Sequence, residues 1–298
     1  MKSVPSILLL VERGDQGHQA LSKALLLARH LYARLDLFLC DTERYSFGRS
    51  SGEEPAEAAL HARVADAREY LQALRKSINA PEIEFSCDAV CHVSLRTALA
   101  DKLGRSRVDL VVKAAHTTQA SRDGHGSIDW PLVASCAAPL LLTRGRPWHP
   151  VPRFAAAVDL QDRQGRALSQ AITALGESLS DGCGAELETL FANSRPEADF
   201  EGERQAATLN ALAQAHGLDV RRLQCLNGEP TEVLPRFVAD RDYDLVVMGK
   251  PRYGGPSEPS RGVAARLVMV TAGDVLFAHA GDGPTRLQVR GRPDSHLP

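Results

Sequence analysis

The sequence repeats itself at long range, and this repeat limits the folds that the chain can adopt. Ala20-Leu21-Ser22-Lys23-Ala24 recurs 147 positions later as Ala167-Leu168-Ser169-Gln170-Ala171. Asp109-Leu110-Val111-Val112 recurs 135 positions later as Asp244-Leu245-Val246-Val247, and this second register holds to the last apolar run of each copy. Matches that keep one register across a loop indicate that a whole folding unit was duplicated. We therefore expect two copies of one fold in tandem.

Each copy alternates short apolar runs with longer helical stretches. Ile7–Val11 opens the first copy and Phe154–Val158 opens the second, and both patterns predict strands. Strands that alternate with helices form parallel sheets joined by right-handed crossovers. The expected fold class is α/β, with two tandem doubly wound parallel-sheet domains at residues 1–146 and 152–281.

Two segments lack this periodicity. Residues 145–152 hold three prolines, which predicts a linker between the copies. Residues 282–298 are rich in glycine, proline and arginine, which predicts a disordered tail.

The composition argues against several classes of partner. The formal net charge is −2 and the basic residues are scattered, which argues against a nucleic-acid partner held through its phosphates. The first apolar run, Ile7–Val11, is too short for a signal peptide or a membrane span. We therefore expect a cytoplasmic protein with no membrane partner. The six cysteines show no metal-binding or redox spacing and are expected to be reduced thiols.

The sequence lacks the common catalytic motifs. G-x-S-x-G, G-x4-G-K-[ST] and H-E-x-x-H are all missing. His116 and His125 share one loop, but a zinc site needs at least three convergent ligands. We therefore expect no metal site and no efficient enzyme, while weak ATPase activity stays open.

Acidic residues and glycines follow the predicted strands. Ligands of doubly wound sheets bind beyond the carboxyl ends of the strands, where the strand order reverses. Glu12 follows the first strand of the first copy, and Asp159 follows the first strand of the second copy. The run Val108–Val112 predicts the fourth strand of the first copy, and Lys113 follows it. Further candidates lie between the fourth strand and the last helix of each copy: Gly126, Ser127, Gly249, Arg252, Gly254 and Gly262.

This arrangement resembles the universal stress protein family over nearly all of both copies. The family has an Asp after the first strand and a G-x2-G-x9-G-[ST] signature between the fourth strand and the last helix. In the second copy Asp159 and Gly249 match, and Gly262 lies thirteen residues after Gly249. Arg252 replaces the second glycine, and Val263 replaces the final Ser or Thr.

The first copy keeps a different part of the signature. Glu12 stands where the family has Asp, and Ala114 and Thr117 stand where it has the first two glycines. Gly126-Ser127 keeps the last pair of the signature. The two copies are therefore unequal versions of one binding motif.

A closer likeness is to the tandem, E-type members of the family. These have Asp-Leu-Val-Val-Lys followed by a His, then Asp-Trp-x-Leu and Cys-x-x-Pro. The corresponding segments here are Asp109–Lys113, His116, Asp129–Leu132 and Cys136–Pro139. Trp130 of this set is expected to pack in the core or between the domains.

The resemblance implies a Rossmann-like fold of the adenine nucleotide alpha hydrolase type. It also implies ATP or AMP, with magnesium, as the ligand. In nucleotide-binding members the acidic residue contacts adenine or its surroundings, and the glycine-rich loop holds ribose and phosphates. Glycines let backbone amides approach phosphate oxygens, and a helix N-terminus adds a favourable dipole.

Each candidate residue also has a purely structural alternative. Asp159 either contacts a nucleotide or caps a helix or turn. Gly249 and Gly254 form a phosphate cradle or only a flexible loop, and Gly126-Ser127 holds phosphate or caps the helix that follows. Arg252 pairs with an anionic ligand or is simply solvated.

The sequence therefore favours a stress-response protein that acts through ligand binding and protein contacts, with degenerate nucleotide sites. Two other functions stay open. One is an ATP-binding stress protein with slow or no hydrolysis, and the other is a binder of a non-nucleotide anionic or apolar ligand in a remodelled cleft. Family members pair through their last strands, so a tandem chain can satisfy this pairing internally. A homodimer is a further option.

Overall fold

The computed structural model describes residues 4–42, 57–115, 129–160, 165–194, 222–250 and 262–279, together with residues 211 and 214. The first half of the chain contains β1 (Ser6–Leu10), α1 (Asp15–Leu31), β2 (Arg34–Asp41), α3 (Glu57–Ser77), β3 (Phe85–Cys91), α4 (Leu95–Arg105), β4 (Leu110–Ala114), α5 (Asp129–Ser135) and β5 (Leu140–Thr143). The second half contains β6 (Arg153–Val158), α6 (Arg166–Cys183), β7 (Glu186–Asn193), β8 (Leu223–Asn227), α8 (Pro230–Ala239), β9 (Leu245–Gly249), α9 (Val263–Val270) and β10 (Asp274–Ala278). The predicted alternation of strands and helices is confirmed.

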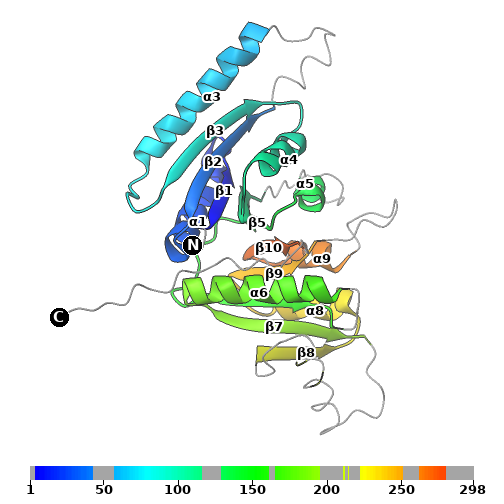
Figure 1. Cartoon of the computed structure of the whole chain (residues 1–298). Coiled ribbons are helices and arrows are strands. Elements are labelled where there is room, and N and C mark those ends of the chain that lie inside the picture. Colours follow the sequence, from blue (N-terminus) through cyan, green and yellow to red (C-terminus); the bar gives the residue numbers. More distant parts are fainter. Residues whose placement is uncertain are drawn as a thin grey trace, which may run out of the picture.

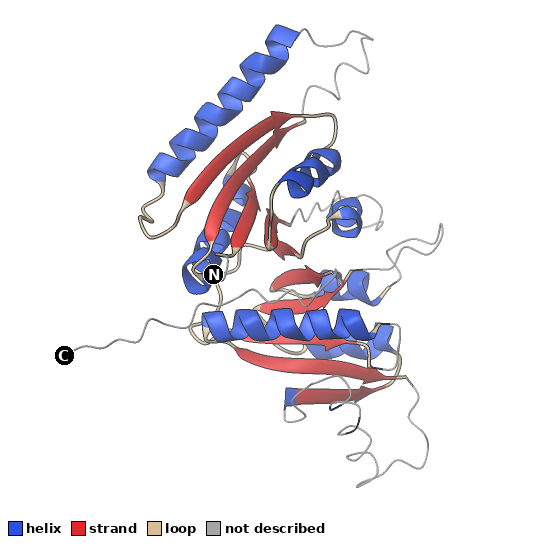
Figure 2. Ribbon diagram, viewed as in Figure 1, coloured by secondary structure: helices blue, strands red, loops and turns tan. Residues whose placement is uncertain are grey.

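The strands of the described residues all join one ten-stranded sheet in the order β3-β2-β1-β4-β5-β10-β9-β6-β7-β8 (Figures 1 and 2). Neighbouring strands within each half run parallel. The two halves meet at an antiparallel pair, in which Leu141 of β5 lies opposite Leu276 of β10. The last strands of the two halves thus pair within the chain, as the resemblance implied, and neither remains an open edge.

Each face of the sheet carries its own hydrophobic core. Side chains alternate along β1, so that Ile7 and Leu9 join one core while Leu8 and Leu10 join the other. Helices α1, α3 and α6 cover the first face, and α4, α5, α8 and α9 cover the second. The strands are buried on both faces, which explains their continuous apolar sequences.

One aromatic contact crosses the seam between the halves. The rings of Trp130 on α5 and Phe277 on β10 meet edge to face, with centroids 6.1 Å apart. Trp130 therefore packs between the two halves, as predicted.

The repeated aspartates have a structural role that explains their place in the repeat. Asp109 Oδ2 accepts a hydrogen bond from the backbone amide of Ser6, at 2.9 Å. Asp244 Oδ2 accepts one from the amide of Arg153, also at 2.9 Å. In both halves, the residue before the fourth strand thus fixes the start of the first strand.

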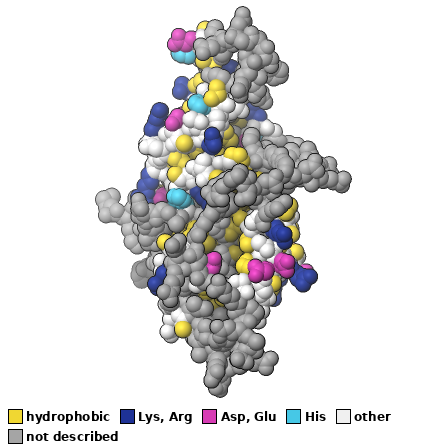
Figure 3. All heavy atoms as spheres, turned by 90° about the vertical axis from the view of Figure 1, so that its right-hand side faces the viewer, with side chains coloured by type: hydrophobic (Ala, Val, Ile, Leu, Met, Phe, Trp, Pro, Cys, Tyr) yellow, Lys and Arg dark blue, Asp and Glu magenta, His cyan; other side chains and the backbone are white. Residues whose placement is uncertain are grey.

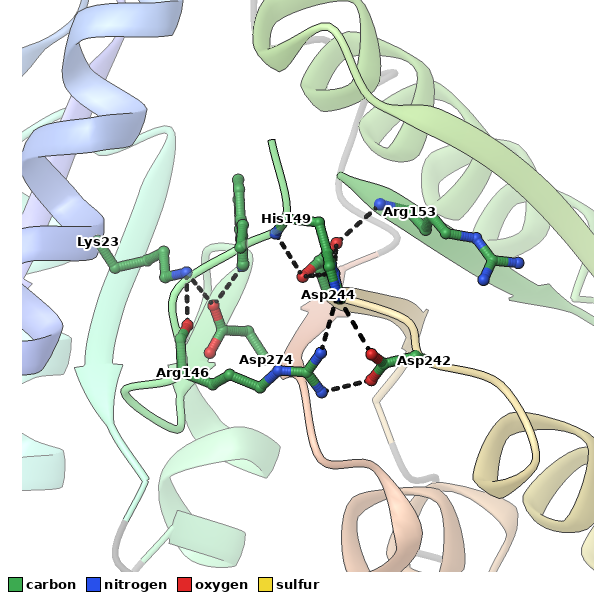
Figure 4. A network of polar contacts seen from close by, with 8 residues as sticks. Lys23, Arg146, His149, Arg153, Asp242, Asp244 and Asp274 are labelled. Atoms are coloured by element: carbon green, nitrogen blue, oxygen red, sulfur yellow. Dashed lines mark hydrogen bonds and ion pairs between the residues drawn. The ribbon is translucent and has the colours of Figure 1, made fainter. Parts of the chain in front are cut away.

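Residues 144–152 connect β5 to β6 without regular structure, as the prolines predicted. The linker is anchored by Asp274, whose side chain is only 1% exposed. Asp274 accepts hydrogen bonds from the Arg144 amide at 2.8 Å and from Trp148 Nε1 at 2.9 Å. The ammonium of Lys23 on α1 lies 3.2 Å from the same carboxylate and 4.1 Å from the centre of the Trp148 ring (Figure 4). The linker is therefore tied to both halves.

Two further aspartates hold the end of the linker (Figure 4). The buried carboxylate of Asp244 lies 2.9 Å from His149 Nδ1 and accepts a hydrogen bond from the His149 amide at 3.0 Å. On the surface, Asp242 lies 2.5 Å from Arg146 Nη1 and 3.2 Å from His149 Nε2. These carboxylates replace, for the linker, the hydrogen bonds that a helix or strand would have supplied.

Figure 3 shows Lys and Arg side chains interspersed with Asp and Glu side chains over the part of the surface drawn in colour. In the described part of the chain, no helix is long and apolar enough to cross a membrane.

Candidate functional site

The sheet has two places where the strand order reverses, and each is a candidate site. In the first half, β1 lies between β2 and β4. In the second half, β6 lies between β7 and β9. Connections leave these neighbouring strands toward opposite faces of the sheet, which opens a crevice at the carboxyl ends. The residues after β1, β4, β6 and β9 are therefore the ones to compare.

In the second half, two predicted residues lie at the ends of neighbouring strands, β6 and β9. Ala156 of β6 lies opposite Val247 of β9. β6 ends at Val158 and β9 ends at Gly249. Asp159, the first residue after β6, thus lies at the same end of the sheet as Gly249.

The backbone at Asp159 is held by α6. The Asp159 carbonyl accepts a hydrogen bond from the hydroxyl of Ser169, at 2.8 Å, and Ser169 is buried. Val158 and Leu160 are also buried, whereas Asp159 is exposed. The chain therefore presents one acidic side chain at the surface of the reversal point, on a fixed backbone.

Gly249 has a clear steric reason to be glycine. A Cβ atom at this position would lie 2.6 Å from Cδ2 of Leu168 on α6. The missing side chain lets α6 lie close to the end of β9. This packing accounts for Gly249 without a ligand.

Two helices of the second half begin at glycines. Gly262 is the N-cap of α9, with φ −80° and ψ 164°, and Gly165 is the N-cap of α6. Neither helix has a side-chain cap among the described residues. A glycine cap offers no side-chain oxygen to the first amides of the helix, so these amides suit an external anion.

Four predicted site residues lie outside the described part of the chain: Gly126, Ser127, Arg252 and Gly254.

In the first half, a lysine occupies the reversal point. Lys113 belongs to β4 and is fully buried, although the sequence predicted that the strand would end at Val112. Its Nζ lies 2.9 Å from Oε1 of Glu12 and donates to the Ala114 carbonyl at 2.9 Å. The strand continues through Lys113 because this internal ion pair compensates the buried charge.

Charged residues around this place are also paired within the chain. Arg13 lies 2.5 Å from Asp66 and 5.0 Å from the centre of the Tyr70 ring, both on α3. Arg63 of α3 lies 2.5 Å from Asp41 at the end of β2. Arg13 and Asp41 thus hold α3 against the carboxyl end of the first half.

Lys250 follows β9 directly, and the sequence analysis did not predict its contacts with the first half. Its ammonium donates to the carbonyl of Cys136 and, at 3.3 Å, to that of Ala138. These carbonyls follow the C-terminus of α5, where a cation is favourable. Burial lowers the pKa of Lys250. This lysine therefore serves to join the halves.

The six cysteines are unpaired, as expected. Burial raises the pKa of Cys40 to about 11 and that of Cys183 to about 12, so these thiols are poor nucleophiles at neutral pH. Among the described residues, no group of three or more His, Cys, Asp or Glu side chains is arranged to hold a metal.

Comparison with known proteins identifies the second half. The sequence model of the universal stress protein family matches residues 152–278. The chain contains a universal stress protein domain. This match covers the reversal point formed by β6 and β9, with Asp159, Gly249 and Gly262. The first half, with Glu12 and Lys113, lies outside it.

Longer similarities extend over both halves. A universal stress protein E homolog of Haemophilus influenzae is 25% identical over 240 residues, which cover 74% of this chain and 77% of that protein. A protein of unknown function from Pseudomonas aeruginosa PAO1 has a TM-score of 0.68 at 22% identity, covering 93% of this chain and 92% of its own. A universal stress protein of Archaeoglobus fulgidus has a TM-score of 0.61 at 14% identity, covering 93% and 97%. The whole chain therefore shares the fold of universal stress proteins.

Proposed function

We propose that this protein acts in the stress response of the cytoplasm by binding an adenine nucleotide, ATP or AMP, in its second half. We further propose that residues 1–146 and 152–281 are its two domains. It acts by binding and by protein contacts, and not as an efficient enzyme.

One observation carries the proposal. Asp159, Gly249 and the start of α9 at Gly262 come from three separate segments, and all follow or precede elements at the same end of the sheet. A carboxylate accepts hydrogen bonds from ribose hydroxyls or from the adenine amino group. The first amides of α9, which receive no side-chain cap from Gly262, suit phosphate oxygens. Magnesium would accompany the phosphates and needs few protein ligands of its own.

The internal pairing of β5 and β10 shapes the possible protein contacts. In universal stress proteins with one domain per chain, the last strand is expected to bind a second subunit. Here that edge is already used inside the chain. A homodimer of this protein would therefore use another surface.

The test is calorimetric titration of the full chain with ATP and AMP, with and without magnesium. We expect binding that weakens about 10- to 100-fold in Asp159→Ala, because one hydrogen bond to a charged group is worth about 1.5–3 kcal/mol. Asp181→Ala, an exposed acidic residue at the far end of α6, is the control and should bind like the wild type.

Thermal unfolding is a second, independent test of nucleotide binding. A nucleotide at 100 times its Kd should add about 2.7 kcal/mol to the free energy of unfolding. If millimolar ATP or AMP does not stabilise the protein, the proposal that it binds an adenine nucleotide is wrong. Stabilisation that is the same in Asp159→Ala would move the site away from this residue. Turnover of bound ATP would instead favour the hydrolytic alternative.

A further inference from the structure

A cavity of about 180 Å³ lies where helices α8 and α9 end. It is lined by residues 238–243 and 270–272. These two segments directly precede β9 and β10, so the cavity lies at the amino ends of the strands, at the opposite end of the sheet from Asp159. A single water molecule needs only about 10–15 Å³ of such space, so a small organic molecule has room here.

The two helices bring their C-termini to the same cavity. Near their starts they are joined by Arg266 of α9, whose Nη1 donates to the carbonyl of Thr231 on α8 at 3.0 Å. The C-terminus of a helix carries a partial negative charge, because its last carbonyls have no partner within the helix. The chain already uses this charge at the end of α9, where Arg144 donates to the Val268 carbonyl. The cavity between the two ends therefore favours a cation.

Asp240 places a carboxylate at this negative end. It is the C-cap of α8 and is exposed. An acidic residue in this position repels the helix dipole, so a cation beside it is favourable. Nearby basic side chains are directed at other carboxylates: Arg241 Nη1 lies 3.8 Å from Glu188 Oε2, and Arg146 Nη1 lies 2.5 Å from Asp242 Oδ1. These arginines leave the Asp240 carboxylate to a cation from outside.

The opposite wall of the cavity supplies a hydroxyl and an apolar surface. Thr271 is only 3% exposed, and its Oγ1 has no hydrogen-bond partner among the described residues. A buried hydroxyl without a partner is costly, and a donor on a bound molecule would remove that cost. Val270, beside it, is an apolar side chain with 40% exposure. The cavity thus combines negative charge, an unused hydroxyl and an apolar surface.

We propose that this cavity binds a short aliphatic amine. The ammonium lies at the Asp240 carboxylate and the Thr271 hydroxyl, and the alkyl chain lies against Val270. An ammonium has three N–H donors and no acceptor, which matches a carboxylate, a hydroxyl and the carbonyls of two helix ends. This site goes beyond the nucleotide function proposed above and does not depend on it, because the two sites lie at opposite ends of the sheet.

The first experiment is NMR titration of the full chain with butylamine, followed through assigned backbone amide signals. We expect a Kd of about 1–10 mM, since a ligand this small makes few contacts. The amide signals of residues 239–243 and 270–272 should shift, and those of Asp159 and Gly249 should not. Shifts confined to the carboxyl ends of the strands, or no shift at all, would overturn the proposal.

Neutral and anionic analogues test on the unaltered protein whether the charge is recognised. Butanol has the same alkyl chain with a hydroxyl in place of the ammonium, and butyrate carries a negative charge. Both should shift the signals of residues 239–243 far less than butylamine does at the same concentration. Equal shifts with butanol would show that the cavity binds the alkyl chain alone, which would contradict a cation site.

Two variants test the residues assigned to the ammonium. Asp240→Asn keeps the shape of the side chain and removes its charge, and Thr271→Val replaces the hydroxyl with a methyl group. Each should weaken butylamine binding about three- to tenfold. Asp181→Asn, an exposed acidic residue on α6, is the control and should bind like the wild type. Wild-type affinity in Asp240→Asn or in Thr271→Val would overturn this arrangement.

Discussion

Single buried charges in this protein are compensated by partners from other segments of the chain. Lys113 meets Glu12, Lys250 meets two carbonyls after α5, and Lys23 meets Asp274. Burial lowers the pKa of Lys23 and raises that of Asp274, and their ion pair opposes both shifts. Each of these charges would be costly alone, so the pairs hold their segments in one arrangement.

Lys23→Met tests the pair that joins α1 to β10. The substitution leaves the Asp274 carboxylate buried without its ammonium and should lower the free energy of unfolding by about 3 kcal/mol at pH 7. Without Lys23 the pKa of Asp274 should rise further in the folded state. The folded state then binds a proton that the unfolded state does not, so the deficit should shrink as the pH falls toward the unfolded pKa of about 3.9.

Urea denaturation of Lys23→Met and of the wild type between pH 4 and pH 8 measures this difference. Lys76→Met, at the exposed end of α3, is the control and should change stability by less than about 0.5 kcal/mol. A deficit that stays constant over this pH range would exclude the buried Asp274 carboxylate as its cause.

The elements are positioned at the candidate site by close packing as well as by polar contacts. The N-terminal part of α6 lies against the end of β9, with Leu168 over Gly249. Ser169, the next residue of α6, holds the Asp159 carbonyl. One helix thus sets the backbone of both reversal-point residues, and a shift of α6 would move them together.

Gly249→Ala should therefore act through Leu168. We expect a loss of about 1–3 kcal/mol, because the new Cβ would overlap a packed side chain. In the double variant Gly249→Ala with Leu168→Ala, the loss should be smaller than the sum of the two single losses, since the overlap is gone. The free energies of unfolding of the wild type, the two single variants and the double variant, from urea denaturation, give the interaction energy between positions 249 and 168.

Gly104→Ala is the control for this series. Gly104 lies in α4 and has no neighbouring atoms within 4 Å of a new Cβ, so alanine should stabilise the protein by about 0.5–1 kcal/mol. Additive losses in the Gly249 and Leu168 series would show that packing does not explain the glycine. Nucleotide binding that survives in the double variant would assign Gly249 a structural role alone.

The whole molecule is organised around the seam between its halves. β5 and β10 lie in the middle of the ten-stranded sheet, with Trp130 on Phe277 on one face. The linker crosses the same region and is fixed by Asp244 and Asp274. The seam is thus stabilised by strand pairing, by an aromatic contact and by buried carboxylates, and we expect the two halves to unfold together.

Native-state hydrogen exchange tests this expectation. Backbone amides that pair across the seam, in residues 140–142 and 275–277, should exchange only through global unfolding and belong to the slowest class. Amides of the edge strand β8 should exchange faster. Seam amides that exchange at a lower free energy than those of β1 and β6 would show that the halves separate before they unfold.

The sequence by itself predicted the alternation of strands and helices and the irregular linker, and it indicated a duplication. These features follow from local periodicity and from repeated segments, which a single chain displays directly. It also predicted that Asp159 and Gly249 follow strands whose carboxyl ends lie at one edge of the sheet.

Only the tertiary structure decided what these residues contact. Glu12 and Lys113, Lys250 and Cys136, and Lys23 and Asp274 are each joined by folding across many residues. A lysine after an apolar run predicts the end of a strand, because burial of an unpaired ammonium is costly. The fold reverses that prediction by supplying a carboxylate from the neighbouring strand end. The partner of a buried charge is a property of the packed sheet, and local sequence patterns do not contain it.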